Sequence, residues 1–190
     1  MKKMIIIAAM ALMSAAATAQ ETVKFAFVDF NEVIMLMPEM DEARATLEEN
    51  EKTNNEILQA MYDELQSKYQ QYQQKAETWT PAIRQSKEAE ITEIQARFEQ
   101  TQQSLSQELS QLQQSLQAPV LEKAQNTVNE LAKAKGIAAV FEKSSLLYVD
   151  ADQLVDLTPE TRVALNIPEG RTLETLQAEM MAKAQAAQQQ

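Results

Sequence analysis

The side chains that most often carry enzyme chemistry do not occur in this sequence. Its 190 residues include no His and no Cys, which excludes the commonest general base, the thiol nucleophile and the usual zinc ligands. Two Gly are too few for a loop that cradles a phosphate or a dinucleotide. Carboxyl groups remain, but a rod-like chain offers no pocket that would raise a carboxyl pKa. We therefore expect a protein that is not an enzyme and needs no cofactor.

Acidic and serine-containing stretches come nearest to a metal or catalytic site. The run EENE at residues 48–51 places its side chains on different sides of a helix, so it predicts a solvated face and not a metal cage. Ser144 and Ser145 lack the base that a hydrolase triad requires. Neither stretch predicts catalytic or metal-binding residues.

Aromatic residues form the most distinctive pattern. Three of the four Tyr and the only Trp lie between residues 58 and 79, and they recur with aliphatic residues at alternating spacings of four and three. Such spacing is typical of a heptad seam between two helices. The seam positions are Leu58, Tyr62, Leu65, Tyr69, Tyr72, Ala76 and Trp79. The pattern alone leaves open whether these rings fill a packing surface or bind something else.

Two long helices must carry this seam. No Gly or Pro interrupts residues 39–80, and Pro81 suits the first turn of a second helix that ends before Gly136. Two helices of similar length joined by a short break predict an antiparallel hairpin, and one continuous parallel coiled-coil rod is the alternative. Pro119 lies inside the second helix, where we expect a kink or a restart, and the seam has a stutter near Leu109. Both positions are predicted hinges.

Short apolar segments flank the helical hairpin. Residues 23–30 are apolar on both faces, which predicts a buried strand, and Asn31 is the expected cap of a short helical turn. Residues 137–141 and 146–149 predict a β-hairpin. Thr158, as an N-cap, opens a short predicted helix. The last twenty residues predict a weak amphipathic helix, and their final segment, AQAAQQQ, is expected to be disordered.

The fold class that follows is α+β, mostly α, with a long antiparallel coiled-coil helical hairpin projecting from a small β body. Three short strands bury too little apolar surface to be stable alone. We therefore expect the body to be completed by oligomerisation with other copies of the chain. The residues expected to be buried between subunits are Phe25, Phe27, Ile137, Val140, Phe141 and Leu147.

The N-terminus has the form of an export signal. Lys2 and Lys3 precede a short apolar run, and ATA at residues 17–19 matches a small-x-small cleavage site, so residues 1–19 are the predicted signal peptide. A retained membrane anchor is the alternative, although the run is too short for a stable span. Removal of both lysines leaves 15 basic and 28 acidic residues, a net charge of −13. This charge disfavours binding to nucleic acid and to anionic membrane surfaces.

In this order the segments resemble the OmpH/Skp family of periplasmic chaperones of Gram-negative bacteria. The resemblance covers about residues 22–167, and it rests on the export signal followed by FAFVDFNEV, LMPE, APVLEKAQNTVNELAKAKGIAAVFEKSSLLYVD and DLTPETRVAL. It implies a homotrimer whose helical arms enclose a cavity that holds unfolded outer-membrane proteins without ATP. It also implies that some arm side chains contact the client. The candidates are Tyr62, Tyr69, Tyr72, Trp79, Phe98 and Leu109.

The resemblance also divides the chain into parts and shows one departure. The parts are a signal peptide (1–19), an oligomerisation body (20–37 and 136–167), a helical arm (38–135) and a partly disordered tail (168–190). The best-known family members are strongly basic, whereas residues 39–135 carry 10 basic and 17 acidic residues, a net charge of −7. We therefore expect client binding that depends weakly on salt. An architectural coiled-coil spacer of the cell envelope is the alternative function.

Overall fold

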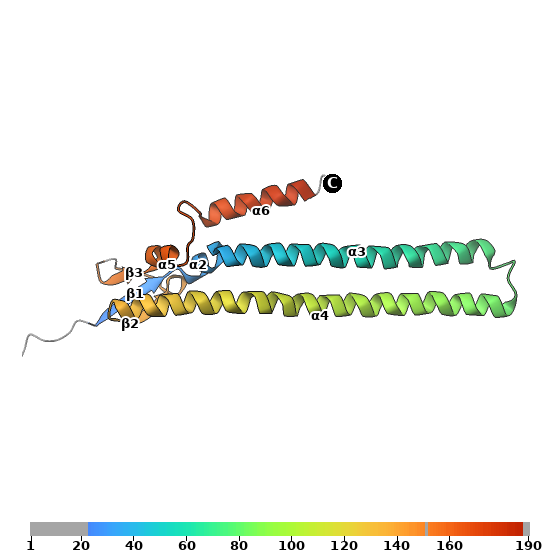
Figure 1. Cartoon of the computed structure of the whole chain (residues 1–190), viewed down its shortest axis with the longest axis horizontal. Coiled ribbons are helices and arrows are strands. Elements are labelled where there is room, and N and C mark those ends of the chain that lie inside the picture. Colours follow the sequence, from blue (N-terminus) through green and yellow to red (C-terminus); the bar gives the residue numbers. More distant parts are fainter. Residues whose placement is uncertain (1–22, 151, 188–190) are drawn as a thin grey trace, which may run out of the picture.

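Two long helices run side by side out of a small sheet (Figure 1). The structure is a computed structural model that describes residues 23–150 and 152–187, so the predicted signal peptide lies outside the described residues. In chain order the elements are β1 (Lys24–Val28), α2 (Phe30–Leu36), α3 (Pro38–Lys75), α4 (Pro81–Ala134), β2 (Ile137–Glu142), the 3-10 turn η2 (Lys143–Ser145), β3 (Leu154–Asp156), α5 (Thr158–Ala164) and α6 (Leu173–Ala187). The predicted α+β class, mostly α, and the antiparallel helical hairpin are confirmed.

Proline and glycine set the ends of the two long helices. Met37 is extended, with φ −61° and ψ 139°, and Pro38 then begins α3. The hydroxyl of Thr80 accepts a hydrogen bond from the N–H of Ile83 (3.4 Å) as α4 begins. α4 ends where Gly136 adopts φ 65°, a left-handed conformation that glycine reaches at little cost. Local sequence therefore determines both ends of the arm.

α4 continues through Pro119 as one helix (Figure 1), so the predicted restart is wrong. Pro119 and Ser115 are both exposed, and the Ser115 carbonyl, which receives no N–H from the proline, can therefore be hydrated. The next residue, Val120, is buried in the core of the body, which holds α4 in place on the C-terminal side of the proline. Pro119 as a hinge remains a prediction.

β1 lies at the centre of a parallel sheet with the strand order β2-β1-β3. Ala26 pairs with Val140 on one side and with Val155 on the other. The predicted β-hairpin is therefore wrong, because β2 is a strand but residues 146–149 are not, and the second partner of β1 is β3. Since β2 and β3 both run parallel to β1, no tight turn can join them, and a longer segment connects the two strands.

The core lies between one face of the sheet, α2, α4 and α5. Ala26 and Val28 of β1 pack in one buried cluster with Leu36 of α2, Val128 of α4 and Leu165 at the end of α5. The cluster joins the two ends of the described chain to the base of the arm. The arm therefore starts from a packed body, although that body is small.

Two capping residues differ from the prediction. The N-cap of α2 is Asp29 and not Asn31, since the Asp29 carboxylate accepts the N–H of Glu32 (3.0 Å). Thr158 lies inside α5, and its hydroxyl accepts the N–H of Asp29 (2.9 Å), which ties α5 to the end of β1. At the start of α5, the carboxylate of Asp156 accepts a hydrogen bond from the N–H of Thr158 (2.8 Å).

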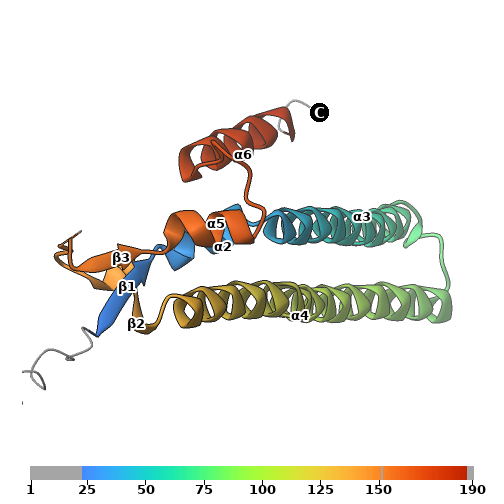
Figure 2. The ribbon, with the colours of Figure 1, turned by 60° about the vertical axis from the view of Figure 1, so that its left-hand side comes forward.

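α6 lies beside α3, on the side away from α4 (Figures 1 and 2). The predicted C-terminal helix is confirmed, and Leu176 is buried in the core of the body. The predicted disorder of residues 184–190 is wrong for 184–187, which belong to α6 because Ala and Gln favour helix once it has begun, and 188–190 lie outside the described residues. None of the helices in residues 23–150 and 152–187 combines the length and apolarity needed to cross a bilayer.

Candidate functional site: the helical arm and the open face of the sheet

A narrow apolar seam between α3 and α4 holds the arm together. Ile91 and Ile94 of α4 are buried in it, and Met61 and Leu65 of α3 are half-buried. Most other arm side chains are exposed, so the arm has a line of packed residues and no enclosed interior. The arm can therefore present most of its surface to a partner.

Tyr62 and Tyr69 lie beside this seam and not in it. Their side chains are 51% and 45% exposed, so the predicted seam positions are wrong at these two residues. Met61 and Lys68, one position earlier in each case, are half-buried instead. Because a spacing of seven returns to the same side of a helix, the two exposed rings lie on one side of α3, about 10 Å apart along its axis.

Ion pairs cross the seam and explain why a lysine occupies it. Lys68 pairs with Glu90, and Arg97 pairs with Glu64 at 3.0 Å. Lys87 binds the other carboxylate oxygen of Glu90 at 2.6 Å. Hydrogen bonds from Lys68 and Lys87 lower the pKa of Glu90 to about 2, so this carboxylate stays charged at any physiological pH. Since these side chains still reach solvent, the pairs add little to stability, and those between the two helices mainly fix the register of the helices.

The far end of the arm carries a packed aromatic pair. The ring centroids of Tyr72 and Trp79 lie 5.9 Å apart with an interplanar angle of 64°, an edge-to-face arrangement. The Tyr72 hydroxyl donates a hydrogen bond to the Glu88 carboxylate, and this bond raises the pKa of Tyr72. Both rings are half-buried, so their first role is to close the end of the helical hairpin.

A polar gap interrupts the seam near the middle of the arm. Asn54 donates a side-chain hydrogen bond to Asn50 (3.1 Å), and both residues are half-buried. A cavity of about 320 Å³ lies there, lined on α4 by Leu105 and Leu109. Phe98 is half-buried on the same helix. Phe98 and Leu109 are the two α4 residues predicted to contact a client. Phe98 packs partly within the arm, and Leu109 lines the cavity at the gap.

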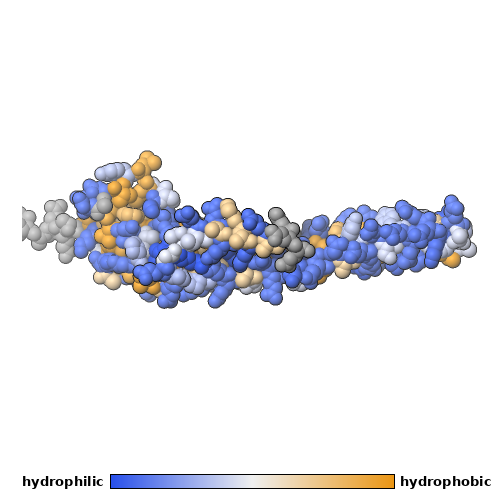
Figure 3. Space-filling view, turned by 90° about the horizontal axis from the view of Figure 1, so that it is seen from above, coloured by the Kyte–Doolittle hydropathy of each residue, from blue (hydrophilic) through white to orange (hydrophobic). Residues whose placement is uncertain are grey.

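The sheet face away from the core is apolar and partly open. Phe25 and Phe141 are each 40% exposed, and their ring centroids lie 6.1 Å apart. Phe27, on the same face, is buried. Leu147, in the loop between η2 and β3, is fully exposed. Figure 3 shows apolar side chains gathered over the body, whereas the outer part of the arm is mainly hydrophilic. Because parallel sheets are normally covered on both faces, this open face is a candidate contact with another chain.

Ile137 and Val140, which were also expected between subunits, are placed differently. Both are partly buried against the core of their own chain. Val140 pairs with Ala26, so its side chain lies on the core face of the sheet. The candidate contact surface thus keeps Phe25, Phe141 and Leu147 of the predicted set, whereas Phe27 is buried and Ile137 and Val140 pack within their own chain.

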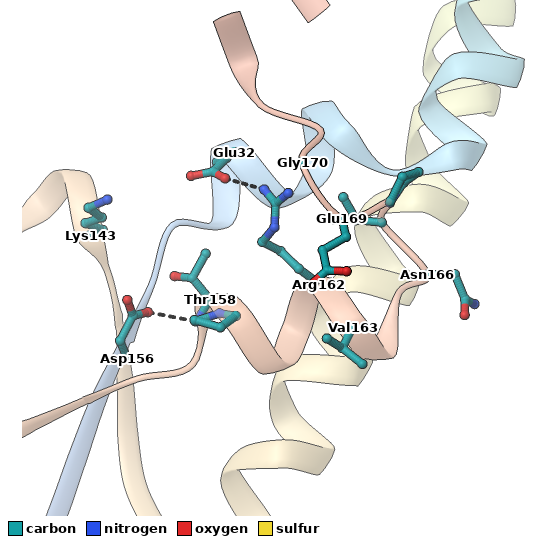
Figure 4. A pocket seen from close by; sticks show the side chains of 12 residues that line it. Glu32, Lys143, Asp156, Thr158, Arg162, Val163, Asn166, Glu169 and Gly170 are labelled. Atoms are coloured by element: carbon teal, nitrogen blue, oxygen red, sulfur yellow. Dashed lines mark hydrogen bonds and ion pairs between the residues drawn. The ribbon is translucent and has the colours of Figure 1, made fainter. Parts of the chain in front are cut away.

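A cavity of about 800 Å³ lies beside α5 (Figure 4). Arg162 reaches across to Glu32 of α2 and also donates to the carbonyl of Arg171. Lys143 pairs with Asp29 at 3.1 Å, and this hydrogen bond raises the pKa of Lys143. Both cations are thus held by acids of their own chain and are not free to bind an anion. Sequence reasoning missed this cavity, because Glu32 and Arg162 are 130 positions apart.

Comparison with known proteins identifies this combination of arm and body. The family model described as "Outer membrane protein (OmpH-like)" matches residues 24–165, which include the whole arm and most of the body. This chain belongs to the OmpH-like family.

Two relatives match most of this OmpH-like chain. The chaperone protein Skp of Yersinia enterocolitica is 25% identical over 160 residues, which are 84% of this chain and 96% of that protein. The crystal structure of an OmpH-like protein from Caulobacter crescentus superposes with a TM-score of 0.69 at 11% identity, covering 78% of this chain and 86% of that chain. The fold is therefore shared at low sequence identity. α6 lies beyond residue 165, where the family match ends.

Proposed function

We propose that this chain is an ATP-independent holdase of the periplasm, which binds unfolded outer-membrane proteins between its helical arms and prevents their aggregation. The observation that carries the proposal is a long two-helix arm projecting from a body with an open apolar face, in a chain of the OmpH-like family. The relative named as a chaperone supports it. The predicted signal peptide, residues 1–19, supports export to the periplasm.

The body is the surface through which copies of the chain would assemble. Phe25, Phe141 and Leu147 expose apolar side chains near the base of the arm, and a homotrimer would bury them around its symmetry axis. Three copies would set three arms around a central space. The arm needs no partner for its own packing, because its seam lies between α3 and α4 of one chain.

Client contacts in this space would be many and weak. Tyr62 and Tyr69 offer the most exposed rings on α3, and each combines an apolar face with a polar hydroxyl. A client held loosely at many points keeps most of its conformational entropy, so it is bound without being folded. Hinge motion near Pro119 would let the arms spread around clients of different size. Release needs no ATP, because a client that has folded in the membrane no longer offers the bound surface.

Charge contributes little to binding in this proposal. The arm is acidic overall, so it does not attract acidic clients over long distances. We expect client affinity to change by less than about threefold between low and physiological salt, measured by fluorescence anisotropy of a labelled client. A steep loss of affinity with added salt would show that electrostatic attraction dominates.

Light scattering of a denatured outer-membrane protein diluted into buffer without nucleotide tests the function. We expect the chain without residues 1–19 to suppress the scattering. The double variant Tyr62→Ser with Tyr69→Ser should suppress it less well, whereas Gln66→Ser with Gln73→Ser, a matched pair of exposed α3 positions with the same spacing, should behave like the unmodified protein. An architectural spacer would leave the scattering unchanged, and that result would overturn the proposal.

A further inference from the structure

α6 is fixed to the base of the arm at its beginning only. Arg171, just before the helix, pairs with Asp41 of α3 at 2.7 Å, and Arg44 pairs with the same oxygen of Asp41 at 2.7 Å. Leu176, in the first turn of α6, is buried in the core of the body. The side chains at 177–186 are exposed. α6 is therefore a helix anchored at one end, with most of its length free of packing.

A cleft of about 430 Å³ separates this free part of α6 from α3. Leu47 on α3, and Met180 and Ala184 on α6, give the cleft apolar walls. The two helices lie side by side here in both ribbon views (Figures 1 and 2). A helix that served only to complete the core would pack its apolar side against α3, and this one leaves space.

The rim of the cleft carries both signs of charge. Arg44 and Glu48 lie on α3 with Glu51, and Lys183 lies on α6 across from them. The rim carries two cations and two anions, and Arg44 is already paired with Asp41, so the rim has no excess of cations. A neutral rim does not select a nucleic acid or an anionic lipid surface, since both need an excess of cations. Apolar walls with charges of both signs instead match a polypeptide whose apolar and polar side chains alternate.

We propose that this cleft binds an extended segment of unfolded polypeptide, with α6 acting as a clamp that holds the segment against α3. The inference rests on the proposed holdase function and adds a site to it. The sequences that form strands in outer-membrane proteins alternate apolar and polar residues. In an extended segment of such a protein, the apolar side chains would contact the apolar walls of the cleft, and the polar side chains would face its charged rim. Met180 suits this use, because its flexible, polarizable side chain adapts to different partners.

Among the described residues, the cleft is lined by side chains of α3 and α6 alone. β1 begins at the end of the body away from the cleft (Figure 1). α6 lies beyond residue 165, where the family match ends, so the family match does not cover this site.

Photocrosslinking from two neighbouring methionines tests the site directly. The chain has no Cys, so Met180→Cys and Met181→Cys can each be labelled uniquely with a benzophenone maleimide. The two side chains are similarly exposed, 51% and 55%, but only Met180 lines the cleft. With a urea-denatured outer-membrane protein as the probe, we expect several-fold more adduct from position 180 than from 181. Equal yields from both positions would overturn the clamp.

A reversible lock provides the second measurement. Glu48→Cys with Lys183→Cys, joined across the cleft by a cleavable bismaleimide, should weaken probe binding by about fivefold, and reduction of the linker should restore it. Glu48→Cys alone, treated in the same way, should bind like the unmodified protein. Unchanged affinity of the locked form, or tighter binding after truncation at Gly170, would overturn the clamp. Failure of the unmodified protein to bind the probe would instead overturn the holdase function itself.

Discussion

Removing a buried side chain from the seam should destabilise the arm without destabilising the body. Ile94 of α4 is 4% exposed and Ile83 of the same helix is 46% exposed, so Ile→Ala at the two positions makes the same chemical change in and out of the seam. Burial of an Ile in a full core makes Ile→Ala cost about 2–5 kcal/mol. Because the seam lies between only two helices, neighbouring side chains can relax into the cavity that the substitution leaves. We therefore expect Ile94→Ala to lower the free energy of unfolding of the arm by about 2–3 kcal/mol.

The control change should cost much less. Ile83→Ala removes little buried surface, and Ala is the better helix former by about 0.4 kcal/mol, so the net effect should stay below about 0.5 kcal/mol. The Thr80 cap is kept, because the bond to it comes from the backbone N–H of residue 83.

Hydrogen exchange followed by mass spectrometry measures both effects in each part of the molecule. A loss of about 2–3 kcal/mol should speed exchange of α4 amides around Ile94 by about 30-fold or more, while amides near Leu36 and Leu165 in the body should keep their rates. This follows because the arm is held by its own seam and the body by a separate cluster. Equal effects of the two variants, or equal loss of protection in arm and body, would show that the seam does not hold the arm independently of the body.

Three further predictions concern the body, the end of the arm helix and an ion pair. Thr158→Val leaves the Asp29 N–H without its acceptor, so the free energy of unfolding in urea should fall by about 1–3 kcal/mol, and an unchanged value would contradict the structure. Gly136→Ala adds a side chain at φ 65° with no heavy atom within 4 Å, so thermal unfolding should report only backbone strain of about 1–2 kcal/mol; a larger loss would reveal a steric clash. The pKa of Glu90 is lowered from 4.5 to about 2, so the stabilisation from its lysine partners is present above pH 4.5 and is lost as pH falls from 4.5 toward 2. NMR titration of this carboxyl should give a midpoint near 2 that rises in Lys68→Met, and a midpoint that ignores the substitution would be inconsistent with the pair.

Local signals made the arm predictable from sequence. Pro38 and Pro81 begin the two long helices, Gly136 follows the second, and the uninterrupted polar stretches between them leave little alternative to helix. These signals act within a few residues of the backbone they control. The helix boundaries could therefore be predicted without knowing the contacts between distant parts of the chain.

Contacts between distant segments were the parts that the sequence did not predict. Residues 146–149 are more typical of a strand than Leu154–Asp156, yet β1 selects the later segment as its partner. The seam pattern assigned Tyr62 to a packed position, but Met61 takes it, and Lys68, seven residues further on, meets Glu90 of the other helix. These outcomes depend on which surfaces the fold brings together.

The candidate sites show the same limit. The exposed aromatic pair on α3 comes from one helix, so its residues could be named from sequence even though their orientation was not predicted. The cleft beside α6 joins residues on α3 to residues on the last helix of the described chain. Its anchor, the pair between Asp41 and Arg171, spans 130 positions. No local pattern indicates such a pair.

Native mass spectrometry of the chain without residues 1–19, mixed with a denatured outer-membrane protein and no nucleotide, tests whether the chain binds its client as a trimer. We expect one dominant complex that contains three copies of the chain and one unfolded client. Single copies that carry a client, or a three-copy assembly that binds none, would contradict it.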